Sequence, residues 1–254
     1  MKKKRPNQRG NFIVYTKRII VFFIVVGTCY LTICGCLHLF VFFTENKKQS
    51  VSDLENADIK KDNSYTELPS ITQKDIRIIL DAGHGGKDAG TSYEEEKEKN
   101  INLAVVEKMK KILEQKGVTV VLTRERDEFI SLDERVNMAN QLEADLFISI
   151  HCNDYIQDAS IKGLECYYME GSLDGECYAN SIIEILKERG NVETRNAKPE
   201  NYRVLRNTKM LSVLIELGYI SNREERQNLI DNDYQEELAE ELVECILQSM
   251  NMSG

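Results

Sequence analysis

The segment IILDAGHGGKDAG, residues 78–90, organises the rest of the chain. The apolar run from Ile76 to Leu80 has the length and composition of a buried strand. The glycines after it permit positive φ and leave room for a group close to the backbone. His84, held in such a turn, could bind a metal or move a proton, or it could be part of a tight turn with no chemical role. The remainder of the chain decides between these two interpretations.

Strand-like and helix-like segments alternate from residue 75 to the end of the chain. Apolar and β-branched runs predict strands at 76–80, 118–123, 146–150, 163–169 and 213–217. Helical spacing predicts helices at 101–114, 131–141, 178–188 and 233–250, and a short helix after residue 221. Capping-box patterns begin two of these helices, at Ser131 and at Ser221. The alternation predicts an α/β fold with a mainly parallel sheet covered by helices on both faces.

The N-terminal part has a different composition. An uncharged run from Ile19 to Phe43 exceeds the roughly 20 residues that cross a bilayer. The first 18 residues carry seven basic side chains and no acidic one, which predicts a cytoplasmic tail and a main body outside. A cleaved signal peptide is the alternative, but its apolar core is usually about 7–15 residues and ends in small residues. We expect a single-pass membrane anchor at 19–43, a flexible linker at 44–74 and a catalytic domain at 75–254.

The main body is acidic. The chain has a net charge of -9 although its first 18 residues contribute only positive charge, so the remainder carries -16. This balance argues against nucleic acid as a partner. Cys166 and Cys177 could pair in an oxidising compartment, or they could be small core residues. No C-x-x-C pair occurs, which argues against a zinc ribbon or a thioredoxin-type site.

Four candidate functional groups fall at strand ends or at a helix start. His84 follows the first strand, His151 ends another, Glu98 precedes the helix at 101–114, and Glu216 ends the strand at 213–217. Two histidines and one carboxylate suit a catalytic zinc with a water in the fourth position. For a lone strand-end histidine, or for Glu98 within its charged run, a structural role is the simpler interpretation. Glu216 stands out because an unpaired carboxylate in an apolar strand is costly or has a shifted pKa.

These motifs together resemble zinc-dependent N-acetylmuramoyl-L-alanine amidases of the amidase_3 type, over about residues 77–246. The matching segments are DAGHGGKDAG at 81–90, EKNINL at 98–103, LTR at 122–124 with Asp127, Leu132 and Arg135, SIHCN at 149–153, and VLIELGYISN at 213–222. Two departures are Ala89 and Leu211, where the family often has proline. Both concern the stiffness of the backbone and leave the four chemical groups in place.

The resemblance implies an enzyme of the bacterial cell wall. Its substrate would be peptidoglycan, cut at the amide between the lactyl group of N-acetylmuramic acid and L-alanine. One zinc ion per chain would be held by His84, Glu98 and His151, and Glu216 would be the general base. Arg206 and Asn153 are candidates for binding the substrate; Arg206 could also be a plain surface arginine. We expect a monomer at the cell membrane, with cell separation, wall turnover and spore cortex processing all open as its role.

Other functions remain open at this point. A different zinc amidohydrolase of wall peptides, such as a carboxypeptidase, would have a similar metal site. A catalytically dead wall-binding module would be expected to lack a ligand or the glutamate, and none is missing here. A serine hydrolase is disfavoured because no Gly-x-Ser-x-Gly occurs. A P-loop is disfavoured because Gly86-Lys87 is followed by Asp88.

Overall fold

The elements of the fold follow the apolar segments of the sequence. The computed structural model describes residues 76–252. The strands are β1 (Arg77–Ala82), β2 (Ser92–Tyr93), β3 (Glu96–Lys97), β4 (Thr119–Leu122), β5 (Leu146–Asn153), β6 (Glu165–Met169), β7 (Lys198–Glu200) and β8 (Leu211–Tyr219). The helices are α2 (Glu98–Gln115), α3 (Leu132–Gln141), α4 (Leu173–Arg189), α5 (Arg203–Arg206), α6 (Arg223–Ile230) and α7 (Asn232–Met252).

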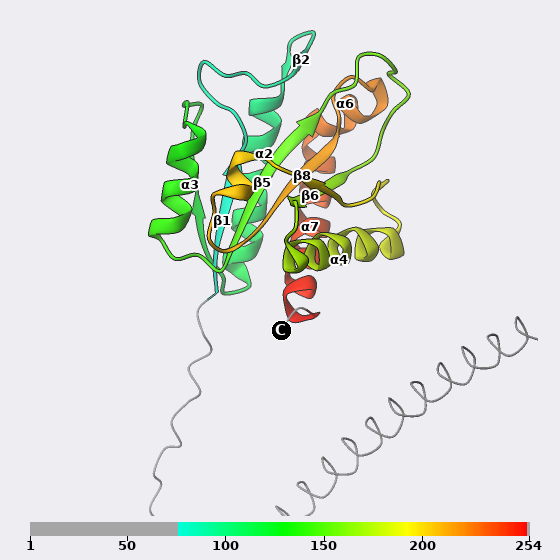
Figure 1. The fold of residues 1–254 in the computed structure, drawn as a ribbon. Coiled ribbons are helices and arrows are strands. Elements are labelled where there is room, and N and C mark those ends of the chain that lie inside the picture. Colours follow the sequence, from blue (N-terminus) through cyan, green and yellow to red (C-terminus); the bar gives the residue numbers. More distant parts are fainter. Residues whose placement is uncertain (1–75, 253–254) are drawn as a thin grey trace, which may run out of the picture. The chain divides into compact units, whose positions relative to one another are not determined.

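The central sheet has the strand order β4-β1-β5-β8-β6-β7 (Figure 1). Strands β4, β1, β5 and β8 pair in parallel, and so do β6 and β7, whereas β6 runs antiparallel to β8. Strands β2 and β3 form a separate hairpin just before α2. The predicted mainly parallel sheet of an α/β fold is therefore confirmed.

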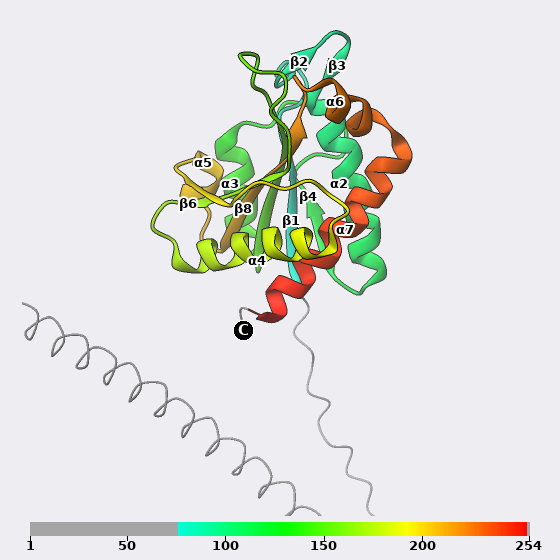
Figure 2. The same ribbon diagram turned by 90° about the vertical axis from the view of Figure 1, so that its right-hand side faces the viewer.

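Helices cover both faces of the sheet, as predicted. Successive strand residues point to opposite faces, so in β1 Ile78 and Leu80 join one apolar core while Ile79 joins the other. The larger core includes side chains of α2, α4 and α7, and the smaller one includes Phe147 with side chains of α3 and α5. Figure 2 shows α3 and α5 on one side of the sheet and α2 and α7 on the other. The smaller core leaves room at the strand ends for a site.

Helix starts test the sequence patterns directly. The capping box at Ser131 is present: its side chain accepts from the Glu134 N–H, and the Glu134 carboxylate accepts from the Ser131 N–H. The prediction at Ser221 is wrong by one residue. Asn222 caps α6 by accepting from the Glu225 N–H at 3.1 Å, because it lies three residues before that glutamate, and Ser221 Oγ instead accepts from the backbone of Tyr155.

Some elements differ from the expected ones. Helix α4 begins at Leu173 rather than at residue 178, because Ser172 caps it by accepting from the Gly175 N–H. The hairpin β2–β3, strand β7 and helix α5 were not expected from the sequence. Cys166 and Cys177 are not disulfide-bonded: Cys166 is buried and Cys177 is exposed.

The predicted N-terminal tail, anchor and linker, residues 1–18, 19–43 and 44–74, lie outside the described residues. Between residues 76 and 252, no helix combines the length and the apolar character that crossing a bilayer requires.

Candidate active site

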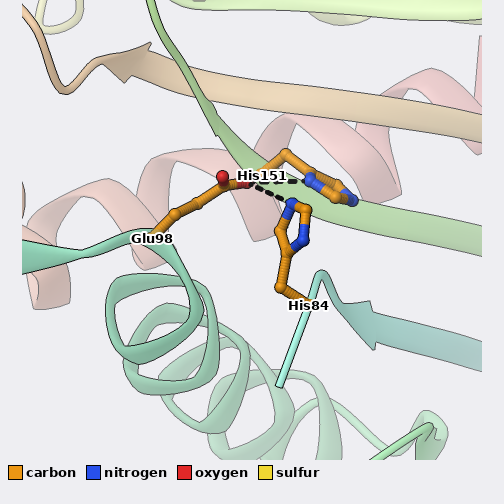
Figure 3. A group of neighbouring side chains, drawn as sticks. All are labelled: His84, Glu98 and His151. Carbon is orange, nitrogen blue, oxygen red and sulfur yellow. Dashed lines mark hydrogen bonds and ion pairs between the residues drawn. The ribbon is translucent and has the colours of Figure 1, made fainter. Parts of the chain in front are cut away.

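Three of the predicted residues meet at one edge of the sheet. His84 follows β1, His151 lies near the end of β5, and Glu98 is the first residue of α2. One ligand atom from each of the three lies within 4.8 Å of the others. Figure 3 shows both imidazole rings directed at the Glu98 carboxylate. His151 Nδ1 lies 2.9 Å and His84 Nε2 lies 3.2 Å from Glu98 Oε1.

The turn after β1 fixes the His84 ring. His84 has a φ of 62°, in the left-handed region. A tight turn stabilises this strained backbone conformation. In it the backbones of Gly85 and Asp88 exchange two hydrogen bonds, of 2.8 and 3.1 Å. The Asp88 carboxylate lies 2.8 Å from His84 Nδ1, so Nε2 is the ring nitrogen left for a ligand. A carboxylate on the second ring nitrogen is the usual support of a metal-bound histidine.

Two glycines make the close approach possible. A Cβ built on Gly83 would come within 2.3 Å of the His151 ring, and one on Gly90 within 2.4 Å of Glu98 Oε2. Gly90 also has a φ of 67°. Any side chain at either position would therefore push a ligand out of place.

The hairpin before α2 fixes Glu98, which is 3% exposed. The Thr91 N–H donates to Glu98 Oε2 at 2.8 Å, and the Glu98 N–H donates to the Thr91 carbonyl at 3.0 Å. The Cys152 N–H donates to Oε1 at 3.1 Å. These bonds distinguish Glu98 from its acidic neighbours in the sequence, which belong to the hairpin rather than to the site.

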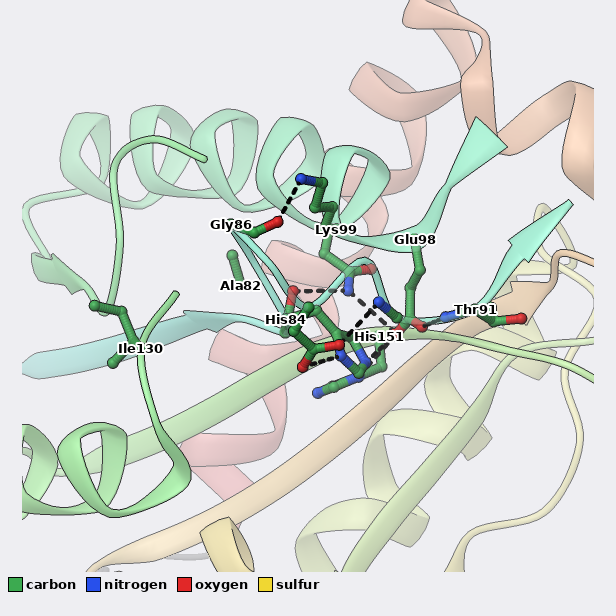
Figure 4. A network of polar contacts seen from close by, with 12 residues as sticks. Ala82, His84, Gly86, Thr91, Glu98, Lys99, Ile130 and His151 are labelled. Carbon is green, nitrogen blue, oxygen red and sulfur yellow. Dashed lines mark hydrogen bonds and ion pairs between the residues drawn. The ribbon is translucent and has the colours of Figure 1, made fainter. Parts of the chain in front are cut away.

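Basic side chains from neighbouring elements donate hydrogen bonds to the backbone of the turn after β1. Figure 4 shows the Lys99 ammonium donating to the Gly86 carbonyl, at 2.8 Å. Arg135 donates to the His84 carbonyl at 2.7 Å and also pairs with the Asp81 carboxylate. Arg124, only 2% exposed, donates to the carbonyls of residues 82, 83 and 99. The position of His84, a candidate metal ligand, therefore depends on the buried contacts that hold this turn.

The electrostatics of the three residues favour a positive charge between them. Burial lowers the pKa of His84, but the Glu98 and Asp88 carboxylates outweigh it and raise the pKa to about 9. Burial would raise the pKa of Glu98, yet its contacts with His151 and His84 hold it well below the usual range. The pKa of His151 is likewise raised despite burial, by Glu98 and by Glu216. A positive charge beside Glu98 is therefore favourable, whether an imidazolium or a metal cation carries it.

The donor set fits a catalytic metal centre. Two imidazole nitrogens and one carboxylate oxygen converge, the Gly83 backbone leaves space beside them, and both His84 and Glu98 have supporting partners. This combination is the one found in zinc hydrolases that keep the fourth position for water. His84, Glu98 and His151 could thus hold a metal ion.

Glu216 lies beside this group. In the sheet register it is directly opposite His151. Its Oε2 atom is shielded from solvent and has no hydrogen-bond partner among residues 76–252. Burial raises the pKa of Glu216 to about 7, with His151 opposing the shift and the charges of Glu98 and Glu165 adding to it. A carboxyl group with a pKa near neutrality can both accept and donate a proton at physiological pH.

A cavity of about 420 Å³ opens over these groups. His84, His151 and Glu216 line it, and its apolar wall includes Phe129, Leu132 and Tyr202. These last three side chains are 42%, 51% and 39% exposed. The cavity therefore has the candidate metal-binding and catalytic side chains in one part of its wall and partly exposed apolar side chains in another.

Neither of the two candidates for substrate binding is among the residues that line the cavity. Arg206 is exposed, donates to the Asn201 side chain at 2.9 Å and is not among the residues lining the cavity; Arg203 is. Asn153 uses both ends of its side chain internally, donating to Glu165 Oε2 at 3.1 Å and accepting from the backbone of Asp154 at 2.8 Å.

Sequence reasoning missed several residues that support the site. Asp88 and the backbone of Thr91 orient two of the metal-ligating candidates, and Glu165 lies opposite Glu216 in the sheet. Glu165 could have been found by the argument that singled out Glu216, because it is also a lone carboxylate in a predicted strand.

Comparison with known proteins agrees with this geometry. The profile of the family Amidase_3, described as N-acetylmuramoyl-L-alanine amidase, matches residues 78–248. The chain belongs to the Amidase_3 family. The match covers the central sheet except for Arg77, the first residue of β1, and includes all four candidate residues for metal binding and catalysis.

Relatives of the Amidase_3 family support the assignment. The chain is 32% identical over 196 residues to a Staphylococcus epidermidis protein named "Probable cell wall amidase LytH"; this covers 76% of the chain and 64% of the relative. The chain thus matches just under two thirds of that curated relative's length.

Solved Amidase_3 structures have the same fold. An N-acetylmuramoyl-L-alanine amidase from Clostridium difficile 630 is similar with a TM-score of 0.67 and 33% identity, over 70% of this chain and 98% of that one. The CwlD amidase from Clostridioides difficile, solved in complex with the GerS lipoprotein, is similar with a TM-score of 0.66 and 31% identity, over 70% and 99% of the two chains.

Proposed function

We propose that this chain hydrolyses the amide between the lactyl group of N-acetylmuramic acid and L-alanine in peptidoglycan. The observation that carries the proposal is the Glu216 carboxylate, unpartnered at Oε2, beside the converging His84, Glu98 and His151. Membership in the Amidase_3 family supplies the bond that is cut. The cavity of about 420 Å³ beside Glu216 gives the substrate access to these groups.

The proposed cofactor is one zinc ion per chain, held by His84, Glu98 and His151. A zinc ion there would polarise the scissile carbonyl, lower the pKa of a water molecule and stabilise the negative charge that develops on oxygen. Asp88 and the Thr91 N–H keep His84 and Glu98 in position for binding.

Glu216 moves the proton. Its Oε2 is free to accept a proton from the attacking water as the new C–O bond forms. The same carboxyl group then gives that proton to the alanine nitrogen as the C–N bond breaks. The products are the lactyl carboxylate and a free alanine amine, so no group on the protein changes between turnovers.

Mass spectrometry of muropeptides tests the reaction. The full-length protein, purified in detergent with zinc, should release stem peptides that begin with a free L-alanine amine. Loss of a terminal residue from the stem peptide instead would indicate a carboxypeptidase. Intact muropeptides together with retained binding would indicate a catalytically dead wall-binding module.

Metal analysis tests the ligands. We expect His84→Ala and His151→Ala to remove most of the bound zinc, because each deletes one of three protein ligands. Glu94→Gln is the matched control, since Glu94 lies between β2 and β3 and is not one of the three residues whose ligand atoms converge. Stoichiometric zinc in both histidine variants would overturn the assignment.

The proposed location is the outer face of the cell membrane, with the protein acting as a monomer. The support is the uncharged run at 19–43 behind the basic residues of the tail. Protease added to intact protoplasts should release a soluble fragment that begins within residues 44–74. A protected main body, or a secreted protein that begins near residue 44, would contradict the anchor.

A further inference from the structure

A second buried carboxylate lies beside the proposed base. Glu165, the first residue of β6, is 0% exposed and pairs in register with Glu216 across the antiparallel β6–β8 ladder. Directly opposite residues of such a pair point to the same face of the sheet. Glu165 thus continues the row of functional groups that starts with His151 and Glu216.

Two cations compensate this single carboxylate. Glu165 Oε1 accepts from Arg195 Nε at 2.7 Å and from Lys198 Nζ at 2.5 Å. Its Oε2 accepts from the Tyr167 hydroxyl at 2.5 Å and from Asn153. A buried carboxylate needs compensation, but the neutral donors on Oε2 and one cation on Oε1 would already provide a partner for each oxygen. The group therefore holds one positive charge in excess of the Glu165 charge.

The excess charge is accessible. The side chains of Arg195 and Lys198 are 38% and 43% exposed, while that of Glu165 is 0% exposed. A lysine ammonium has three N–H donors, and among the described residues Lys198 spends one of them on Glu165. The others are left for a ligand. The centroids of the Tyr219 and Tyr167 rings lie 5.9 Å from Arg195 Cζ and Lys198 Nζ, respectively.

The orientation of the scissile amide required for cleavage directs the stem peptide toward Arg195 and Lys198. The scissile carbonyl must face His84, Glu98 and His151, and the leaving nitrogen must be near Glu216, which gives it a proton. The stem peptide then continues away from the metal ligands. In the strand order β5-β8-β6-β7, the next strands past Glu216 are those that carry Glu165 and Lys198. Strands are about 4.8 Å apart, which is one to two residues of an extended peptide at about 3.4 Å each.

We propose that Arg195 and Lys198, oriented by Glu165, bind a carboxylate of the stem peptide one or two residues beyond the scissile amide. This subsite rests on the proposed amidase function. Glu165 is its positioning residue, and the two cations make the contact. The competing explanation is that both cations only neutralise Glu165.

Paired substrates separate the two explanations. We would use two synthetic N-acetylmuramoyl peptides that differ only in whether the α-carboxyl group of the second peptide residue is a free acid or a carboxamide. The full-length protein should prefer the acid, with a KM about 2- to 5-fold lower, the scale of one partly exposed ion pair. Lys198→Met should raise the KM for the acid by the same factor, leave kcat within about 2-fold and change the KM for the amide little.

Two further variants complete the kinetic test. Lys198→Arg keeps the charge and should restore most of the preference for the acid. Lys111→Met removes an exposed cation from α2, on the opposite face of the sheet, and should change neither KM. An equal loss on both substrates in Lys198→Met, or a loss on neither, would overturn the subsite in favour of simple neutralisation of Glu165.

Calorimetry keeps the subsite separate from the proposed function. Binding of both peptides to Glu216→Gln and to Glu216→Gln/Lys198→Met requires no turnover. Tighter binding of the acid, lost in the double variant, supports the subsite even if the wild-type protein cleaves neither peptide, a result that would reject only the amidase function. Equal binding of acid and amide to Glu216→Gln would reject the subsite even if both peptides are cleaved.

Discussion

Asp81 and Glu216 are both carboxylates at strand ends on the same face of the sheet, and their surroundings differ. Asp81, 1% exposed, pairs with Arg135 and accepts from Thr123 Oγ1 and Ser149 Oγ, each at 2.7 Å. Glu216 Oε2 has no partner. Burial raises the pKa of each group, but in Asp81 the Arg135 charge and the two hydroxyls outweigh burial and lower the pKa, whereas the pKa of Glu216 rises to about 7.

The difference in hydrogen-bond partners suits the two carboxylates to different roles, one in stabilising the fold and one in proton transfer. A carboxylate that pairs with a buried guanidinium and accepts on both oxygens is stabilised as an anion and is a poor base. Asp81 instead ties β1 to α3 through Arg135. A carboxylate with a free oxygen in a shielded place is poorly stabilised as an anion and is ready to accept a proton. Removing either group should therefore have different consequences.

The largest expected effect is on turnover. Glu216→Gln keeps the shape of the side chain but cannot accept the proton, so we expect turnover to fall about 10²- to 10⁴-fold. The free energy of unfolding should stay the same or rise, because a shielded charge is replaced by a neutral amide. Muropeptide cleavage rates and urea denaturation measure the two quantities. Turnover within tenfold of wild type would remove Glu216 from the role of base.

The second effect is on stability. Asp81→Asn leaves the Arg135 guanidinium buried without its counter-ion, so we expect the free energy of unfolding to fall by about 3–5 kcal/mol. Urea denaturation, with Glu216→Gln as the matched comparison, measures this loss. A fall below about 1 kcal/mol would mean that Asp81 is not the structural member of the pair.

The third effect is on the pH dependence of stability in the metal-free protein. Glu216 has a pKa of about 7 when folded, against 4.5 as the model value. Its protonated form therefore contributes stability that is present below pH 4.5 and is lost as the pH rises through 7. The stability advantage of Glu216→Gln over wild type should grow between pH 5 and pH 7.5, as urea denaturation at both values would show.

The contribution of Asp81 to the free energy of unfolding should change with pH in the opposite direction. Its pKa is lowered from the model value of 3.8 in the folded protein, so its stabilising contribution is present above that value and is lost as the pH falls through the lower, folded one. If the free energy of unfolding of wild type and of Glu216→Gln changed with pH in the same way, the pKa of Glu216 would not be raised in the folded protein. The contrast with Asp81 would then fail.

The smallest effect is the loss of one hydrogen bond. Ser149→Ala removes one of the donors to Asp81 and should cost about 1–3 kcal/mol, the range for a hydrogen bond to a charged group. Turnover should stay close to wild type, because the Arg135 pair and the His84 turn remain. A large loss of turnover with full stability would show that Ser149 acts on the site rather than on Asp81.

Most of the sheet could be predicted because each long strand is a mainly apolar run. The short elements could not: β2, β3 and β7 have two or three residues and α5 has four, which is too short for a hydrophobic period to develop. Their positions depend on tertiary contacts instead. The hairpin, for example, is closed by the Glu98 N–H, which donates to the Thr91 carbonyl, and by the Thr91 N–H, which donates to the Glu98 carboxylate.

The site was partly predictable for a related reason. His151 and Glu216 stand out because they are polar groups within mainly apolar strands, and His84 stands out in the glycine-rich turn after β1. The resemblance to the family singled out Glu98. Glu165 interrupts a predicted strand in the same way, but its cations come from 30 and 33 residues further along the chain. No local pattern connects such distant residues, so the cationic group at β6 and β7 became visible only in three dimensions.

The antiparallel direction of β6 has a consequence for insertions and deletions. Because β6 runs opposite to β8, the first residue of β6 reaches the edge where β5 and β8 end. Removing a single residue inside β6 would slip its register by one and send Glu165 to the opposite face, with Cys166 moving the other way. Removing one from the turn at 170–172 would leave that register intact. Length changes should therefore be tolerated after β6 and not within it, which makes the spacing of this strand as much a part of the site as the residues it carries.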